Sequence, residues 1–252
     1  MLLSAQNITK VYRDKGGTDI AALNHVNLSV EIGDFIAIMG PSGSGKTTLL
    51  NVLSGIDGFD SGSLKISDNN IRKMSKNDLA LFRRRRLGFV FQEFNLLDSL
   101  TMKENIMLPL ILDGKLPKEM ESRVQEVATL LSIDTIIEKY PYNVSGGQQQ
   151  RAAICRAIIN NPDILFADEP TGNLDSKSSK AVMECFRKLN EDNADTILLV
   201  THDVYAASYA RKVVFLRDGT VEKELYRQSN RISFYDEILN YLAEIGGDSD
   251  DA

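Results

Sequence analysis

The chain has 252 residues, of which 43% are hydrophobic, and this size and composition suit one large globular domain or two small ones. Its formal net charge of −6 and isoelectric point near 5.1 argue against a general nucleic-acid-binding surface, so no nucleic-acid partner is expected. No apolar run approaches the roughly 18 residues that span a bilayer, and residues 1–10 lack the pattern of a signal peptide, so we expect a soluble, cytoplasmic protein.

The first part of the chain predicts strands that lead to a glycine-rich loop. Residues 2–12 and 21–30 have the pattern of strands. Residues 35–39 are an apolar strand candidate, and a helical run covers residues 48–53. Between these two elements, residues 40–48 read Gly-Pro-Ser-Gly-Ser-Gly-Lys-Thr-Thr.

This loop fills every fixed position of the phosphate-binding P-loop, in the strand–loop–helix context that the motif requires. Its glycines allow a sharp turn with N–H groups that point inward. Lys46 brings a positive charge to the outer phosphates, and the Thr47 hydroxyl can reach Mg²⁺. The sequence therefore predicts a site for a nucleoside triphosphate and Mg²⁺, formed by Gly40, Pro41, Ser42, Gly43, Ser44, Gly45, Lys46, Thr47 and Thr48.

The next segment predicts a short strand and a capped helix. Residues 62–66 are the strand candidate. Ser75 is the expected N-cap of a helix that runs to about Arg86, with Asp78 at the third position. The helix ends in four arginines, residues 83–86, which form either a solvated helix end or a contact with phosphate or lipid headgroups near a membrane.

A helical region then interrupts the strands. Residues 88–91 predict a strand that ends at Gln92. From about residue 95 to residue 161 the hydrophobic period changes to 3.6, and residues 102–112 and 119–131 are amphipathic helix candidates. We interpret this region as a helical insertion in an α/β core.

The second half of the chain returns to strands. Residues 163–167, 196–200 and 212–216 are short apolar runs of the kind that is buried on both faces of a parallel sheet. A helix candidate over residues 177–189 separates the first two runs. The alternation predicts a doubly wound α/β core.

The C-terminal segment predicts one more helix. Hydrophobic residues recur at helical spacing from Phe234 to Ile245, so we expect a helical extension over residues 228–247. This helix either packs on the core or contacts a partner. The acidic residues 248–252 are expected to be disordered.

Two further motifs indicate phosphate chemistry. Asp168 and Glu169 follow a buried strand, at the edge where parallel sheets bind ligands. Asp168 is the natural partner of Mg²⁺, and Glu169 can orient or deprotonate an attacking water. Residues 145–148, Ser-Gly-Gly-Gln, precede a helix expected over residues 149–159, and two glycines at a helix N-terminus form a second anion site.

In their order along residues 3 to about 224, these motifs resemble those of the ATP-binding subunits of ABC transporters. The resemblance implies an α/β P-loop NTPase fold of the ABC-ATPase type. Such a fold has a mainly parallel core sheet, an N-terminal antiparallel β subdomain and an inserted α-helical subdomain. It further implies one ATP-binding domain over residues 1–227, with the helical subdomain at about residues 93–161.

The resemblance also implies a role for each motif residue. Tyr12 would stack on adenine, and residues 40–48 would hold the phosphates. Catalysis would depend on Gln92, Glu169 and His202. The Mg²⁺ ligands would be Thr47, Gln92 and Asp168. The signature that reaches the ATP of the partner subunit would be Ser145, Gly146, Gly147 and Gln148. The D-loop would be Asn173, Leu174 and Asp175.

In this family, two subunits face each other head to tail, and each ATP lies between the P-loop of one subunit and the signature of the other. We therefore expect a homodimer with ATP and Mg²⁺ as cofactors. Because the chain has no membrane segment, transport would need a separate permease. The ATPase would then be peripheral at the inner face of the cell membrane. Its docking groove for the permease would be formed by the segment that begins at Gln92, called the Q-loop, and by the helices after it.

Residues 95–106 resemble the ATPases of macrolide-exporter-type and lipoprotein-release-type permeases. Within that group, residues 105–110, residues 201–209 and the tail after Phe234 resemble the bacitracin-resistance (Bce-type) branch. Bce-type systems protect cell-wall synthesis from antimicrobial peptides such as bacitracin and lantibiotics, and they signal to a sensor histidine kinase.

Three alternatives remain at this stage: an ATPase of a lipoprotein-releasing or macrolide-exporting system, a soluble ABC ATPase of DNA repair or translation, and a regulatory module that does not hydrolyse ATP. The repair type has a long coiled coil between its P-loop and signature, which this sequence lacks. The translation type usually has two ATPase cassettes, and this chain has one. The pair Glu169 and His202 argues against a non-hydrolysing module.

Overall fold

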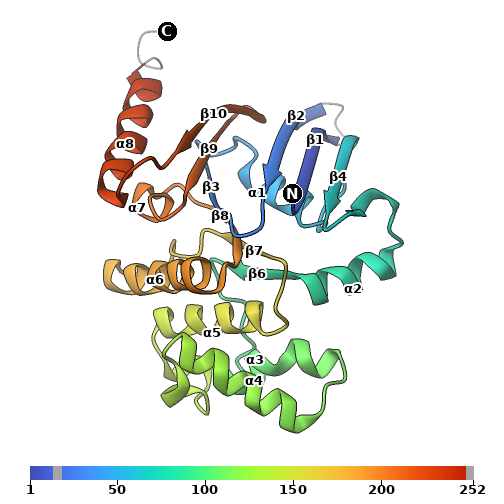
Figure 1. Ribbon diagram of the computed structural model, residues 1–252, viewed down its shortest axis with the longest axis vertical. Helices are drawn as coiled ribbons and strands as arrows, with labels where there is room; N and C mark the ends of the chain where they lie inside the picture. The colour runs from blue at the N-terminus through green and yellow to red at the C-terminus, as the bar shows by residue number, and fades with distance from the viewer. Residues whose placement is uncertain (14–18, 248–252) are drawn as a thin grey trace.

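The computed structural model describes residues 1–13 and 19–247, and within them a six-stranded sheet forms the centre of the fold (Figure 1). The strand order is β10-β9-β3-β8-β7-β6, in which β10 is antiparallel to β9 and the other neighbours are parallel. The strand bounds are β3 Phe35–Met39, β6 Leu87–Phe91, β7 Ile164–Asp168, β8 Thr196–Val200, β9 Lys212–Arg217 and β10 Thr220–Tyr226.

The N-terminal strands form a second, antiparallel sheet in the order β2-β1-β4-β5. Its strands are β1 Leu3–Arg13, β2 Asp19–Val30, β4 Ser61–Ile66 and β5 Asn69–Asn70. Leu3 pairs with Val30 on one side and with Ile66 on the other. Both the mainly parallel core sheet and the antiparallel sheet agree with the fold class that the sequence predicts.

Eight α-helices and three short 3₁₀ helices cover and connect the sheets in the described part of the chain. The α-helices are α1 Lys46–Leu53, α2 Lys76–Arg86, α3 Met102–Leu112, α4 Pro117–Leu130, α5 Gly146–Ile158, α6 Ser176–Asn193, α7 Val204–Ala207 and α8 Arg231–Gly247. The 3₁₀ helices are Ile71–Lys73, Asp134–Ile136 and Pro141–Asn143. None of these helices combines the length and the apolar character that a membrane-spanning helix requires.

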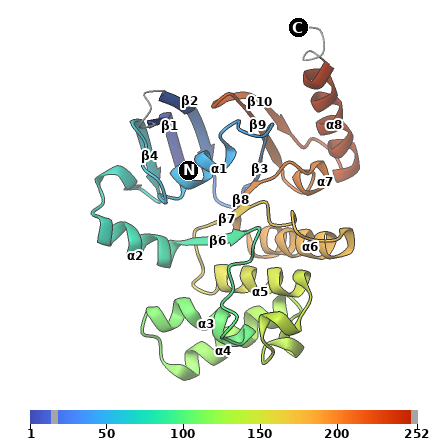
Figure 2. The same ribbon diagram turned by 180° about the vertical axis from the view of Figure 1, so that it is seen from behind.

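Strand β3 separates two hydrophobic cores. Phe35, Ala37 and Met39 face the core that contains α3, α5 and α6, whereas Ile36 and Ile38 face the core that contains α1 and the antiparallel sheet. This division follows from the period of two in a strand, which sends successive side chains to opposite faces. Figure 2 accordingly shows α1 beside the antiparallel sheet, and α5 and α6 beyond β6 and β7.

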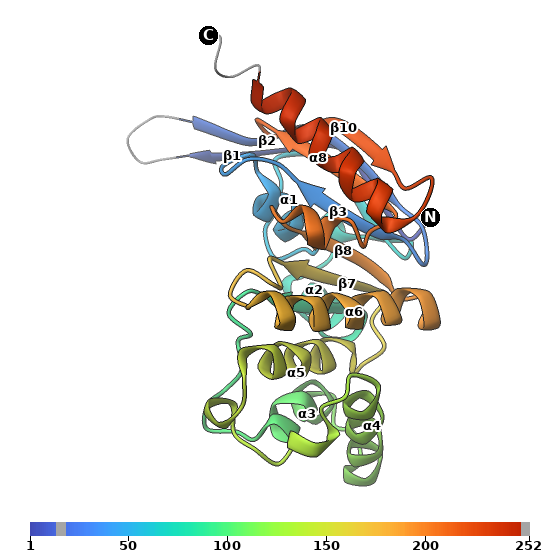
Figure 3. The ribbon, with the colours of Figure 1, turned by 90° about the vertical axis from the view of Figure 1, so that its left-hand side faces the viewer.

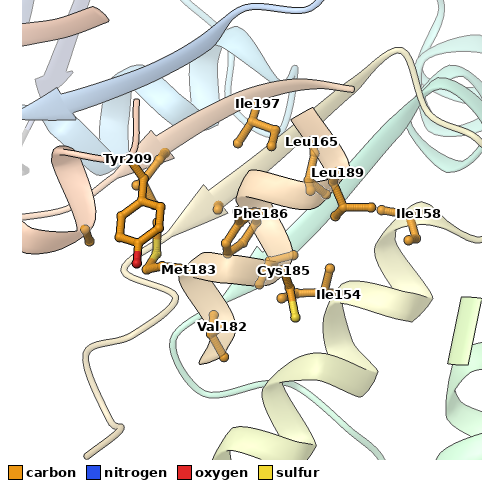
Figure 4. Packing of buried hydrophobic residues seen from close by; sticks show 14 of the residues in the cluster. Ile154, Ile158, Leu165, Val182, Met183, Cys185, Phe186, Leu189, Ile197 and Tyr209 are labelled. Atoms are coloured by element: carbon orange, nitrogen blue, oxygen red, sulfur yellow. The ribbon is translucent and has the colours of Figure 1, made fainter. Parts of the chain in front are cut away.

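Helix α6 packs between the central sheet and α5. Its residues Met183 and Phe186 are fully buried. In Figure 4, they lie between Leu165 and Ile197 of the sheet and Ile154 of α5. The tight packing of this layer fixes the position of the loops at both ends of α6 relative to the sheet.

The C-terminal helix α8 packs on the core, which is one of the two positions that the sequence allows. Phe234, Ile238 and Tyr241 are buried, and the Tyr241 ring lies edge-on to Phe215 of β9 at 4.5 Å between ring centres. Figure 3 shows α8 across the end of the central sheet, next to α7. Residues 248–252, for which the sequence predicts disorder, lie outside the described residues.

Several helix boundaries differ from the sequence predictions: α1 begins at Lys46, α4 at Pro117 and α8 at Arg231, where the predicted starts are residues 48, 119 and 228. Two further differences have a clear structural reason. Helix α5 begins at Gly146 and not at Gln149, because Ser145 and Gln148 form a capping box that includes both glycines in the first turn. Helix α6 extends to Asn193, four residues past the predicted end at Leu189. Its buried Asn190 donates hydrogen bonds to the carbonyl oxygens of Gly33 and Asp195.

The arginines at the end of α2 all make intramolecular contacts. The Arg83 guanidinium donates to the Gly55 carbonyl at 2.7 Å, and Arg86 pairs with Asp163 at 2.7 Å. Arg84 and Arg85 both reach Asp113 at the end of α3, at 2.9 and 3.1 Å. The run therefore connects α2 to neighbouring elements.

The burial of α8 predicts different effects for two adjacent residues. Replacing Ile238, which is fully buried, with alanine should lower the free energy of unfolding by about 2–5 kcal/mol through lost burial and a cavity. Replacing Leu239, which is 46% exposed, should change it by less than about 1 kcal/mol. Urea unfolding followed by circular dichroism measures both, and equal effects would contradict this packing of α8.

Candidate functional site

The P-loop connects β3 to α1 at the carboxyl edge of the central sheet. Gly45, the N-cap of α1, has a left-handed backbone with φ of 99°. The Lys46 ammonium donates to the carbonyl oxygens of Gly40 at 2.9 Å and Pro41 at 2.8 Å. These bonds hold the lysine charge over the loop, at the N-terminus of α1, where the helix dipole also favours an anion.

Two loop glycines are required by close backbone contacts. A Cβ atom on Gly40 would lie 2.0 Å from the Leu216 carbonyl oxygen, and one on Gly45 would lie 2.4 Å from the Ala22 carbonyl oxygen. A Cβ on Gly43 would meet no atom within 4 Å in the described structure. The loop is thus confined on its protein side and open at Gly43, as a phosphate cradle requires.

A cavity of about 500 Å³ extends from the P-loop to Tyr12 on β1. The Tyr12 hydroxyl donates to Asp57 at 2.8 Å, and its ring remains 42% exposed at the cavity edge. Partial burial acts to raise the pKa of Asp57, but hydrogen bonds from Lys10 and Tyr12 outweigh it and lower the pKa. The structure thus brings Tyr12 and the P-loop to one cavity, where an aromatic ring can stack on a base.

The turn between β9 and β10 also lines this cavity. Asp218 and Gly219 both have positive φ, and both line the cavity. The Gly219 N–H donates to the carbonyl oxygen of Ser44 in the P-loop at 3.0 Å. The Asp-Gly pair is a sequence signal for the turn, but no signal places it beside the P-loop.

Asp168 ends β7 beside the P-loop. Burial raises the pKa of its carboxyl group, and the neighbouring charge of Glu169 adds to this, whereas Thr47 and Lys46 act in the opposite direction. Its Oδ1 atom is buried and has no hydrogen-bond partner among the described residues, and the same holds for Ser44 Oγ. A buried carboxylate oxygen without a partner fits a cation or its water shell.

These groups fit Mg²⁺ held mainly by a nucleotide. In residues 1–13 and 19–247, no group of three or more His, Cys, Asp and Glu side chains is arranged to hold a metal ion. Mg²⁺ commonly takes one or two protein ligands and obtains the rest from phosphates and water. Thr47 and Asp168 can supply these one or two protein ligands.

Glu169 and His202 form a pair at the ends of β7 and β8. Glu169 Oε1 lies 2.8 Å from His202 Nδ1. The Glu169 backbone is left-handed, with φ of 47°, and its N–H donates to the Val200 carbonyl at 2.9 Å. Non-glycine residues rarely adopt this conformation, and it occurs most often where the surrounding structure aims a functional side chain.

Gln92 lies against the D-loop in this structure. Its side-chain Nε2 donates to Asn173 Oδ1 at 2.9 Å, and Asn173 Nδ2 donates to the Gln92 carbonyl at 3.3 Å. Of the three expected Mg²⁺ ligands, the structure thus brings Thr47 and Asp168 together and pairs Gln92 with Asn173. The sequence places Gln92 and Asn173 in separate motifs, and nothing in either motif signals their contact.

Asp175 of the D-loop is the N-cap of α6. Its side chain accepts hydrogen bonds from the backbone N–H groups of Lys177 and Ser178, at 2.9 and 3.0 Å. Leu174 contacts the signature, since a Cβ on Gly146 would lie 3.2 Å from Leu174 Cδ2. The D-loop therefore connects the signature to the loop that follows Glu169.

The signature forms the N-terminus of α5. The Ser145 N–H donates to Gln148 Oε1 at 2.9 Å, and Ser145 Oγ accepts from the Gln148 N–H at 3.4 Å. A Cβ on Gly147 would lie 2.8 Å from Ser178 Cβ, so the approach of α6 requires glycine there. The next turn of α5 contains Gln150, which the sequence does not mark; its buried amide donates to the carbonyl oxygens of Phe91 and Pro170.

Within one chain, the signature and the P-loop are apart. Helix α1 lies in the core on one face of β3, and α5 lies in the core on the other face. Figures 1 and 2 show the two helices on opposite sides of the central sheet. The two anion sites predicted from the sequence therefore do not line one cavity in this chain.

The comparison with protein families decides the identity of this site. The model described as "ABC transporter" matches residues 23–172, which include the P-loop, the signature and Asp168. The chain belongs to the ABC transporter family. It is an ATP-binding, ATP-hydrolysing subunit of that family.

Two relatives match over almost the whole chain. "ABC transporter ATP-binding protein YxdL" of Bacillus subtilis (strain 168) is 50% identical over 250 residues, which cover 99% of this chain and 96% of YxdL. "Bacitracin export ATP-binding protein BceA" of Halalkalibacterium halodurans is 46% identical over 251 residues, which cover 99% of each chain. The resemblance to ABC-transporter ATP-binding subunits is thus confirmed.

A solved structure confirms the fold. The ATP-binding cassette MJ0796 of Methanocaldococcus jannaschii, in a dimeric post-hydrolysis state bound to ADP and Pi, superposes with a TM-score of 0.82. It is 39% identical, and the match covers 90% of this chain and all of the MJ0796 chain. The P-loop NTPase fold of the ABC-ATPase type that the sequence predicts is therefore correct.

The raised pKa of Asp168 predicts that this residue lowers the stability of the nucleotide-free protein, although it supports metal binding. Burial makes the charged form of this carboxyl less favourable in the folded state than in the unfolded state. Asp168→Asn should therefore raise the melting temperature of the nucleotide-free protein by roughly 1–3 °C. This gain should fade as the pH falls through the raised pKa, because the wild-type carboxyl is then neutral too.

The same variant should lose the extra thermal stabilisation that Mg²⁺ adds to ATP. Thermal melts at several pH values, with and without Mg²⁺-ATP, measure both effects. Asp163→Asn is a matched control, because Asp163 pairs with Arg86 at another edge of the sheet. Full Mg²⁺-dependent stabilisation in the Asp168 variant would exclude the metal role.

Proposed function

We propose that this chain is the ATPase of an ABC exporter of the Bce type, which protects the cell from antimicrobial peptides such as bacitracin and takes part in sensing them. The observation that carries the proposal is the similarity to BceA over 99% of both chains, a match that includes the C-terminal segment. The chain would work at the inner face of the membrane through a separate permease, which in turn would contact a sensor kinase.

The proposed working unit is a head-to-tail homodimer with two ATP molecules. The P-loop cavity of one subunit is open, and the signature of the same chain lies on the other side of the sheet. A second copy can bring its Ser145–Gln148 segment to that cavity, and the MJ0796 cassette is dimeric. ATP would then favour the closed dimer, because only the closed form contacts the triphosphate from both sides.

Glu169 is the proposed general base for the attacking water. Its carboxylate accepts a hydrogen bond from the Nδ1–H group of His202 at 2.8 Å, and this pairing orients both side chains before the nucleotide arrives. Lys46 stabilises charge on the transferring phosphoryl group. Mg²⁺, held by Thr47 and Asp168, would neutralise the phosphates when bound.

Gln92 is the proposed sensor of the permease. To contribute to the metal site, its side chain must release Asn173 of the D-loop. The segment after it is held by Arg156, whose guanidinium donates to the carbonyl oxygens of Phe94 and Asn95. Phe94 and Asn95 both have left-handed backbones, which is typical of a segment that stores strain.

A groove of about 480 Å³ beside this segment is the proposed docking site for a cytoplasmic helix of the permease. It lies between the end of α2, β6, α3 and α5, and its apolar lining includes Phe89, Leu108 and Leu112. Arg156 also lines it, so a helix seated there can move the Gln92 segment directly.

A lipoprotein-releasing or macrolide-exporting ATPase is the second candidate, since residues 95–106 resemble both groups.

Two substitutions separate binding from hydrolysis. Glu169→Gln should retain ATP binding and reduce turnover by at least about 100-fold, because the water loses its base and the amide can still bond His202. Lys46→Ala should weaken ATP binding at least about tenfold, since a charge-assisted bond to phosphate is lost. Calorimetry and phosphate release measure these effects, and normal phosphate release by the Glu169 variant would refute its role.

The biological role is tested by deletion in the native host. Loss of this chain should increase sensitivity to bacitracin, and complementation with the wild-type chain but not with Glu169→Gln should restore resistance. Unchanged sensitivity to bacitracin and lantibiotics, together with increased sensitivity to macrolides, would favour the second candidate.

A further inference from the structure

A second cavity, of about 670 Å³, borders the pair Glu169 and His202 and reaches the C-terminal helix. Glu169 and His202 line one part of it, and Lys180 of α6 and Arg231 line another. Arg231 is the first residue of α8. The C-terminal helix thus begins at the wall of the cavity that contains the proposed catalytic pair.

Arg231 makes three contacts with the segment after His202. Its Nη1 donates to Ser208 Oγ at 3.1 Å, and its guanidinium carbon lies 5.0 Å from the centre of the Tyr205 ring and 4.6 Å from that of Tyr209. An arginine within about 6 Å of an aromatic ring is attracted by the ring electrons. Arg231 therefore binds both tyrosines at once.

Helix stability does not explain an arginine at this position. The N-terminus of a helix carries a partial positive charge, which disfavours a cation in the first turn. The Asn230 side chain already satisfies the N-terminal donors, since it accepts from the N–H groups of Ile232 and Ser233. The contacts with Tyr205 and Tyr209 account for Arg231 better than any contribution to α8 itself.

The two tyrosines continue the connection to α6. Their hydroxyl oxygens are 2.9 Å apart, and the Tyr209 hydroxyl donates to Glu184 Oε1 at 3.0 Å. Burial, with the neighbouring Tyr205 and Glu184, raises the pKa of Tyr209, so its phenol stays a neutral donor. Because the D-loop residue Asp175 is the N-cap of α6, this network joins α8, the segment after His202 and the helix that follows the D-loop.

The segment after His202 needs such support. Helix α7 has only four residues, and a helix of that length has no stability of its own. Asp203 caps it, and residues 206–210 are buried. The position of His202, which is itself largely exposed, therefore depends on how firmly α7 is held by its neighbours.

We propose that Arg231 is a positioning residue, through which the C-terminal helix holds α7 and thereby sets the position of His202 for ATP hydrolysis. The proposal rests on the proposed ATPase function and on the catalytic role that the resemblance to ABC-transporter ATPases implies for His202.

The first test measures mobility in the full-length, nucleotide-free chain. Arg231→Met should make amide hydrogen exchange of residues 201–210 about 3- to 10-fold faster, with residues 234–245 still protected. Arg72→Met is the matched control: Arg72 also lies over an aromatic ring, Phe59 at 5.3 Å, but it belongs to the 3₁₀ helix Ile71–Lys73, far along the chain from α7 and α8. Unchanged exchange of residues 201–210 in the Arg231 variant would overturn the proposal.

The second test measures catalysis by the chain with its permease. Arg231→Met should lower kcat about 3- to 10-fold and leave KM for ATP within about twofold, because orientation is lost and binding is not. Arg231→Lys keeps a cation for the rings and should restore at least half of the lost kcat. Equal kcat in the Met and Lys variants would show that the cation has no positioning role.

Two reference variants make the outcome decisive. If His202→Ala leaves kcat unchanged, the catalytic role of His202 fails, and this proposal fails with it; if it lowers kcat and Arg231→Met does not, only the positioning role of Arg231 fails. If Arg231→Met unfolds α8, Tyr209→Phe decides, since it keeps both rings and removes the hydroxyl bond to Glu184. Tyr209→Phe should then lower kcat in the same direction, and no effect would refute the connection to α6.

Discussion

The burial of both faces of strand β3 is the constraint on which the rest of the structure depends. Alternate side chains of this strand belong to two separate cores, one with α1 and the antiparallel sheet, the other with α3, α5 and α6. As a result, the helix of the P-loop and the helix of the signature start from opposite sides of one sheet. Each anion site is well formed, yet a single chain leaves it with one open side.

The residues of the candidate site lie at the carboxyl edge of the same sheet. The P-loop follows β3, and Gln92 follows β6. Asp168 is the last residue of β7, and His202 lies two residues after the end of β8. Parallel strands make this convergence possible because their ends meet at one edge. The half-buried carboxylate of Asp168 is unfavourable for folding, and this cost would follow from placing the proposed metal ligand against the sheet.

Side-chain contacts join the loops around this edge to one another. Gln92 bonds to Asn173, Leu174 contacts the signature, and the Glu169 carboxylate bonds to His202. Through these contacts, a displacement of one loop would change the surroundings of the next. Arg156 connects this set to the proposed permease groove, and Arg231 connects it to the C-terminal helix.

The sequence by itself determined the strands, the P-loop and the residues that end each strand, because these are local patterns of a few neighbouring residues. It also determined the fold class, since the order of such patterns along the chain is specific. Only the tertiary structure decided that Gln92 bonds to Asn173, that Asp218 and Gly219 border the P-loop cavity, and that Arg231 binds two tyrosines. These contacts join residues far apart in the chain, and their existence depends on how helices pack on the sheet, which no local pattern specifies.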